Sequence, residues 1–219
     1  MITVTAFKWV PPFAQGVVRD LRVRWALEEA GIPYEEKLIG LDDRDTAAYR
    51  AIQPWGQVPV IEEDGLTLFE TGAILLRIAE RSPVLCPADD AGHARMTQWV
   101  LAALNSVEPA ISALVEIDIF HTDEPWAKER RPGAVAFLKL KLDALAKRLA
   151  GREYLEDRFT AGDLMMATVL RNLRHTDLIT ADPVLGPYLA RCEARPAFQK
   201  ALADQLAAFA AHEPVPEPA

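Results

Sequence analysis

The sequence predicts a chain in two parts, an α/β domain followed by an all-helical domain. With 219 residues, half of them apolar, the chain can bury two small cores. Up to about residue 80 the apolar pattern alternates between the periods of strands and helices, and beyond it only the helical period remains. A proline-punctuated segment, Ser82 to Pro87, lies between the two patterns. We therefore expect an α/β domain at residues 1–81, a linker at 82–89, a helical domain at 90–211 and a loose tail at 212–219.

The first part has the pattern of a mixed sheet covered by helices. Gly31 and Pro33 end the first helix, because glycine caps helix ends and proline cannot continue them. Asp64-Gly65 marks a tight hairpin turn between the last two strands. The resulting order is β-α-β-α-β-β-α. The strands are expected at 2–7, 34–39, 58–61 and 66–69, and the helices at 17–30, 46–52 and 71–81.

The second part reads as helices throughout. Pro109 lies inside the first of them and predicts a kink, because proline removes one main-chain donor. Phe159 to Asp163 is a capping box, in which the Thr160 hydroxyl and the Asp163 carboxylate each bind the other's amide. Any buried helix can use such a box, so we assign it a structural role. The helices are expected at 90–120, 127–150, 160–175, 184–192 and 196–211.

Charge and composition exclude several functions. A net charge of −8 argues against nucleic-acid binding, which needs clustered Lys and Arg. No run approaches the roughly 18 apolar residues of a membrane span, and Met1 to Lys8 is unlike a signal peptide, so we expect a cytoplasmic protein. Cys86 and Cys192 belong to no CxxC pair and the histidines are scattered, so no metal site is expected.

A first chemical motif is the segment Gln57 to Val60. A proline at the start of a buried strand removes a ladder hydrogen bond. A cis Val58–Pro59 bond would turn the N–H and C=O of Val58 outward, where they could pair with an extended peptide. The alternative is a proline in an ordinary edge strand.

A second motif is Phe69 to Ile74, where a strand runs straight into a helix. A helix start offers N–H groups and a positive dipole end, which suit a carboxylate. Thr71 adds a hydroxyl donor, and Glu70 offers a negative partner for an ammonium group. Together these groups would fit the head group of an α-amino acid. The alternative is that both residues simply start the helix.

With both motifs in one β-α-β-α-β-β-α unit, the chain resembles the glutathione transferase family over nearly its whole length. Arg24 to Tyr34, Gln53 to Pro59 and Phe159 to Asp163 carry the resemblance further. It implies a thioredoxin-like N-terminal domain, an all-α helical bundle, and glutathione as co-substrate. It also assigns the glutathione contacts: Val58, before the cis Pro59, to the cysteinyl backbone, Glu70 and Thr71 to the γ-glutamyl end, and Gln57 and Arg44 toward the glycyl carboxylate.

The chain departs from the family pattern at the residue that activates the glutathione thiol. Glutathione transferases usually activate the glutathione thiol with a Tyr, Ser or Cys near the first strand or helix. Residues 1–33 hold only Thr3 and Thr5 as hydroxyls, and no cysteine or tyrosine. A helix end or a nearby cation also lowers a thiol pKa. We therefore expect the amides of Gly16 to Val18 and the cation of Arg19 to serve instead, the alternative for Arg19 being a surface salt bridge.

The resemblance implies a detoxifying transferase that adds the glutathione thiolate to a small hydrophobic electrophile, or reduces a peroxide or mixed disulfide. The missing hydroxyl leaves open a weakly catalytic or non-catalytic binding protein. Isomerisation is disfavoured, because a Ser-Ser-Cys motif is absent. The acceptor is expected between the halves, near Asn105, Glu108 and Ile111.

The resemblance also implies a homodimer, formed by the helices around residues 71–81 and 90–105. Leu76, Met96 and Trp99 are the candidates for that surface, with ordinary core packing as the alternative.

Overall fold

The computed structural model describes residues 1–214, and its contacts divide the chain into two units. The first unit joins Met1–Ser82 with the segment that begins at Pro196, and the second is Pro83–Arg195. The expected domain limits differ in two respects. The sequence places residues 196–211 in the helical domain whereas this helix packs in the first unit, and the residues expected as a linker from Pro83 on belong to the second unit. Of the expected tail, residues 215–219 lie outside the described residues.

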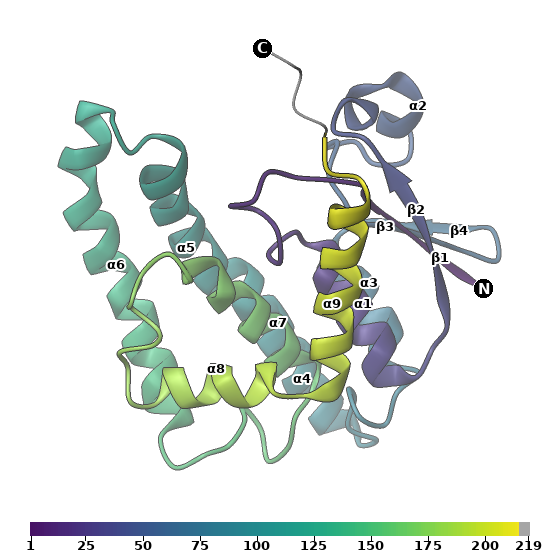
Figure 1. Ribbon diagram of the computed structural model, residues 1–219. Helices are drawn as coiled ribbons and strands as arrows, with labels where there is room; N and C mark the ends of the chain where they lie inside the picture. Colours follow the sequence, from purple (N-terminus) through teal and green to yellow (C-terminus); the bar gives the residue numbers. More distant parts are fainter. Residues whose placement is uncertain (215–219) are drawn as a thin grey trace. The chain divides into compact units, whose positions relative to one another are not determined.

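A four-stranded mixed sheet forms the centre of the first unit, in the order β2-β1-β3-β4 (Figure 1). β1 runs parallel to β2 and antiparallel to β3, and β3 pairs with β4 as an antiparallel hairpin. Asp64 and Gly65, at the predicted turn, both have positive φ. The strands are β1 (Ile2–Phe7), β2 (Tyr34–Ile39), β3 (Val60–Glu63) and β4 (Leu66–Leu68).

The main helices of the first unit pack around α1, which contacts both α3 and α9. Figure 1 shows the yellow α9 alongside α1, where the Trp25 and Phe198 rings meet edge to face at 4.8 Å. Gly31 ends α1 in the left-handed conformation, as predicted. The helices of this unit are α1 (Asp20–Ala30), the 3₁₀ turn η1 (Asp42–Asp45), α2 (Ala47–Arg50), α3 (Thr71–Ala79) and α9 (Pro196–Ala211).

The start of α1 corrects one expectation. The sequence places it at residue 17, but the structure begins α1 at Asp20. Residues 11–17 instead form successive turns, with the Ala14 N–H donating to the Pro11 carbonyl and the Val17 N–H to the Ala14 carbonyl. The apolar pattern of this stretch does not separate a helix from a series of turns.

The second unit is helical, as predicted, and is built around one continuous helix from Asp90 to Phe120. A π-helical turn interrupts this helix just before Pro109, where the sequence predicts a kink. The helices are α4 (Asp90–Ala102), the π turn η2 (Ala103–Val107), α5 (Glu108–Val115), the π turn η3 (Glu116–Phe120), α6 (Pro125–Leu149), α7 (Ala161–Leu170), the 3₁₀ turn η4 (Arg171–Leu173) and α8 (Leu185–Glu193).

Among residues 1–214, this long helix alone has the length and apolarity of a membrane span, with a mean hydropathy of 1.5 over its most apolar stretch. It packs against α6 and α7, and it buries Met96, Val100, Ile111 and Leu114. One face of this helix therefore packs in the core of the second unit.

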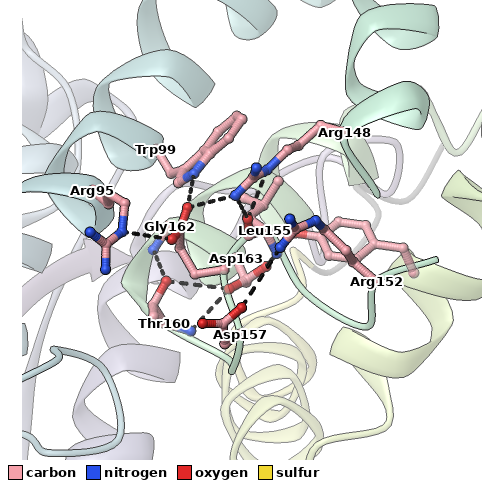
Figure 2. A network of polar contacts seen from close by, with 11 residues as sticks. Arg95, Trp99, Arg148, Arg152, Leu155, Asp157, Thr160, Gly162 and Asp163 are labelled. Atoms are coloured by element: carbon pink, nitrogen blue, oxygen red, sulfur yellow. Dashed lines mark hydrogen bonds and ion pairs between the residues drawn. The ribbon is translucent and has the colours of Figure 1, made fainter. Parts of the chain in front are cut away.

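The start of α7 is closed by its own side chains (Figure 2). Asp163 Oδ2 accepts from the Thr160 N–H at 3.0 Å, while the Thr160 hydroxyl accepts from the Gly162 N–H at 3.2 Å. Asp163 Oδ1 accepts from the Leu155 N–H at 2.8 Å and from the Tyr188 hydroxyl at 3.0 Å. Burial nevertheless raises the pKa of Asp163 to about 6.

Further contacts fix this helix start in the second unit. Glu156 accepts from Arg95, Trp99 and Arg148, which come from α4 and α6. Figure 2 shows these three side chains above the start of α7. A Cβ on Gly162 would lie 2.6 Å from the Cβ of Trp99, so only glycine allows α7 to approach α4 this closely. The capping box is thus part of the scaffold, as the sequence predicts.

Candidate functional site

The start of α3 differs from an ordinary helix start. Glu70 has φ +67° and ψ 115°, a main-chain conformation that disfavours a residue with a Cβ. The side chain of Glu70 makes no capping hydrogen bond to this helix. Glu70 is exposed and Thr71, the first helical residue, is 6% exposed. Main-chain strain of this kind often marks a functional position.

Thr71 contacts a buried cation that sequence reasoning missed. Arg22 of α1 is 2% exposed, and its Nη1 donates to Thr71 Oγ1 at 3.1 Å. The two residues lie 49 positions apart, so only the packing of α1 on α3 brings them together. One indication is present in the sequence: the apolar run from Leu21 to Leu27 carries two arginines, and buried arginines need partners.

The second arginine of that run belongs to a structural network. Arg24 Nε donates to Asp20 Oδ2 at 2.6 Å, and Arg24 also pairs with Glu36 of β2. Gln205 of α9 donates to Asp20 Oδ1 at 2.8 Å. Burial raises the pKa of Asp20, against the opposing effects of Arg24 and Gln205. This network joins α1 to β2 and α9.

The loop before β3 contains the expected cis Val58–Pro59 bond. The ladder between β1 and β3 pairs Val60 to Glu62, so Val58 lies outside it and its N–H and C=O are not used by that pairing. Tyr49 of α2 supports the loop, because its hydroxyl donates to the Gln57 carbonyl at 2.7 Å. Burial raises the pKa of Tyr49 to about 12, so it remains a neutral donor.

The β3–β4 hairpin brings the two motifs together. Ile61 lies opposite Leu68 in its register. Extending that register places Pro59 opposite Glu70, at the end of the sheet where β3 begins and α3 follows β4. The segment with the cis bond and the strained helix start therefore occupy one edge of the first unit.

Gln57 lies in the loop before β3, and Arg44 lies in the neighbouring 3₁₀ turn η1. Gln57 is exposed, and Arg44 is 47% exposed with its Nε 3.3 Å from Asp45 Oδ2. Gly56 has φ +61°, and a Cβ there would lie 2.7 Å from Arg50 Cζ and 3.0 Å from the Arg44 carbonyl oxygen. This close approach holds the Arg44 main chain next to the residue that precedes Gln57.

The region expected to face the glutathione thiol, around the end of β1 and the start of α1, offers few groups that could stabilise a thiolate. Thr5 is fully buried in β1, and Thr3 lies in the same strand. Arg19 is the N-cap of α1 rather than a residue of its first turn, and the N–H of Val17 is already used by the Ala14 carbonyl. The first turn of α1 instead carries the buried Asp20.

The residues expected to face the acceptor are only partly accessible. Asn105 is exposed and Glu108 is partly buried, but Ile111 is 0% exposed and belongs to the core of the helical unit. We therefore withdraw Ile111 as an acceptor contact, because core packing accounts for its burial.

Of the residues expected at a dimer surface, Met96 is also 0% exposed, and Trp99 donates to Glu156. Leu76 is partly exposed. Within residues 1–214, no group of three or more His, Cys, Asp or Glu is arranged to hold a metal.

Comparison with known proteins agrees with this geometry. The family model described as "Glutathione S-transferase, N-terminal domain" matches residues 21–81. Glutathione S-transferase 4 of Zea mays is 30% identical over 211 residues, 90% of this chain and 91% of the relative. Glutathione S-transferase F11 of Arabidopsis thaliana is 31% identical over 206 residues, which cover 86% of this chain and 93% of the relative.

Solved structures agree as well. A glutathione transferase from Burkholderia graminis, crystallised with two glutathione molecules bound per subunit, is 30% identical with a TM-score of 0.80, covering 92% of this chain and 87% of that one. The expected thioredoxin-like domain followed by a helical domain is thereby confirmed. Since the similarity extends over nine-tenths of the chain, this protein belongs to the glutathione transferase family.

Proposed function

We propose that the first unit binds glutathione at the edge formed by the start of α3 and the cis Val58–Pro59 loop. The observation that carries this proposal is the uncapped start of α3, where Glu70 is strained and the Thr71 hydroxyl is backed by Arg22. The α3 amides and Thr71 would bind the γ-glutamyl carboxylate, and Glu70 its ammonium group.

The remaining contacts follow the extended peptide. The Val58 main chain, which the β1–β3 ladder does not use, would pair with the cysteinyl residue. The exposed side chains of Gln57 and Arg44 would lie toward the glycyl carboxylate. Each role rests on a polar group that is accessible or unused by the sheet.

The reaction that we propose is addition of the bound thiolate to a small hydrophobic electrophile. The thiol loses its proton to solvent, the sulfur forms a bond to an electrophilic carbon, and any leaving group departs with the bonding electrons. Arg19 is our candidate for lowering the thiol pKa, and Asn105 and Glu108 are the candidates for contacting the acceptor.

A second function, reduction of a disulfide or peroxide by glutathione, is favoured by one observation. The relative from Burkholderia graminis holds two glutathione molecules per subunit. Two glutathione molecules on one subunit would suit an exchange in which the thiolate of glutathione attacks a mixed disulfide, forms a new disulfide and releases the other thiol. The third possibility is a binding protein with little catalysis, which the lack of a hydroxyl near the thiol favours.

The test is calorimetric titration of glutathione into Thr71→Ala and Glu70→Gln. Thr71→Ala removes a hydrogen bond to the carboxylate, and Glu70→Gln removes the negative charge that would face the ammonium group, so affinity should fall about 10-fold or more in each variant. Thr160→Ala is the matched control, because Thr160 also lies at a helix start but its hydroxyl accepts from a main-chain N–H. Unchanged affinity in both site variants would refute the head-group assignment.

The same proposal includes a cytoplasmic, detoxifying homodimer. Light scattering at micromolar concentration should give twice the chain mass of 24.2 kDa. A single species of monomer mass would refute the dimer.

A further inference from the structure

We infer that Arg22 is a positioning residue for glutathione binding. Its hydrogen bond to Thr71 makes the Thr71 hydroxyl a donor toward the γ-glutamyl carboxylate. The inference rests on the proposed function and adds a residue to it. Arg22 lies on α1, away from both sequence motifs, and reaches the start of α3 through the interior of the first unit.

The hydrogen bond between the two residues has a fixed direction. A guanidinium group only donates, so Thr71 Oγ1 must accept from Arg22 Nη1. A hydroxyl has a single hydrogen, and once its oxygen accepts from Arg22 that hydrogen is left for another acceptor. Arg22 thereby orients Thr71 to donate to a ligand that carries lone pairs, such as a carboxylate.

The charge of Arg22 acts in the same sense. A guanidinium remains protonated at all ordinary pH values, and Arg22 is 2% exposed, so solvent screens its charge weakly. The positive end of α3 begins at the residue that Arg22 contacts. Both charges favour an anion at this helix start over a neutral group.

Arg24 provides the matched comparison. It lies two positions further along α1, which turns its side chain to the opposite side of the helix. There it contacts Asp20 and Glu36 and joins α1 to β2. Both arginines are buried in the same helix, but only Arg22 contacts the proposed ligand site.

The experiment uses two probes, glutathione and γ-aminobutyryl-cysteinyl-glycine, which lacks only the α-carboxylate of the γ-glutamyl residue. Calorimetry with wild-type protein should show a preference for glutathione of about 10-fold or more. Arg22→Met should lose most of that preference, as should Thr71→Ala. The double variant should lose less than the sum of the two single losses, because both residues act on one hydrogen bond to the carboxylate.

Conservative and control variants separate positioning from folding. Arg22→Lys keeps the charge and one donor, so it should restore part of the preference that Arg22→Met loses. Arg24→Lys should lower the melting temperature but leave the preference unchanged. If Arg22→Met does not fold, Arg22→Gln, which keeps a donor without the charge, should show a reduced preference.

A folded Arg22→Met or Arg22→Gln variant with the wild-type preference would overturn the inference and leave the proposed function standing. Wild-type protein that binds neither probe would overturn the proposed function, and the inference with it.

Discussion

Two helix starts in this molecule use similar residues in opposite ways. At α7, Thr160 and Asp163 close the helix (Figure 2). The Asp163 carboxylate accepts from Leu155, Thr160 and Tyr188. At α3, Glu70 and Thr71 leave the helix without a side-chain cap. The Thr71 hydroxyl accepts from Arg22 instead of from its own helix.

The difference separates a structural site from a binding site. The start of α7 has its donors paired within the protein, so a ligand has little to gain there. The start of α3 keeps a strained Glu70 and an uncapped positive end, features that reduce stability unless something binds. Changes at α7 should therefore affect folding, and changes at α3 should affect glutathione.

The largest effect is expected from Asp163→Ala. Removing this carboxylate leaves three buried donors without an acceptor, so the free energy of unfolding should fall by about 4 kcal/mol. Urea denaturation measures this change, and Asp157→Ala, at a fully exposed carboxylate nearby, is the control. The affinity of the folded variant for glutathione should not change. A large loss of affinity would contradict the assignment of a structural role to the start of α7 and a binding role to the start of α3.

The second effect concerns pH. Burial raises the pKa of Asp163 to about 6, from an unfolded value of about 3.9. The folded protein therefore binds this proton more tightly, and the stability that the group contributes is full below pH 4 and is lost as the pH rises through 6. The difference in unfolding free energy between wild type and Asp163→Asn should fall by about 3 kcal/mol from pH 4 to pH 7. A difference that stays constant or rises would contradict this.

Glu70→Gly is expected to have a smaller effect, and, unlike Asp163→Ala, it should stabilise the protein. Glycine adopts positive φ without strain, so the free energy of unfolding should rise by about 1 kcal/mol. Glutathione binding should weaken at the same time, because the ammonium partner is lost. Asp64→Gly relieves the same kind of conformation in the β3–β4 turn and should leave binding unchanged. A Glu70→Gly variant that binds glutathione as tightly as wild type would show that the strain serves another purpose.

The smallest effect is expected at the thiol. A partial helix charge contributes about 0.3–1 kcal/mol, less than one pKa unit, and the N–H of Val17 is already bonded. The pKa of bound glutathione should therefore be modestly depressed, and conjugation should rise steeply between about pH 7 and 9. Thiolate absorbance against pH, for wild type and Arg19→Ala, measures this. Ionisation well below about pH 7 in both proteins would assign the activation to another group.

Most of the fold could be predicted because each element carries a local pattern. Alternating apolar residues, Gly31, the Asp64-Gly65 turn and the capping box all lie within a few positions of the structure that they determine. The placement of α9 in the first unit could not be predicted, because its amphipathic pattern does not say which core it covers.

In the candidate site, too, the features set by local sequence could be predicted, and the contacts between distant residues could not. The cis Val58–Pro59 bond and the helix start at Thr71 lie inside local motifs, so the sequence predicts them. The positive φ of Glu70 is seen only in the structure. Arg22 and Tyr49 lie outside the motifs and contact motif residues that are 49 and 8 positions away, and only the folded structure shows those contacts. The burial of Ile111 could not be predicted, because one face of a long helix has several possible neighbours, whereas the burial of Met96 agrees with the core-packing alternative.

The most direct measurement is a crystal structure of this protein with glutathione bound. We predict that the γ-glutamyl carboxylate lies within hydrogen-bond distance of the Thr71 hydroxyl and its N–H, with Arg22 still donating to Thr71 Oγ1. The cysteinyl residue should pair with the Val58 main chain, and the sulfur should have no side-chain hydroxyl beside it. A head group bound away from the start of α3 would contradict the proposed contrast between the two helix starts.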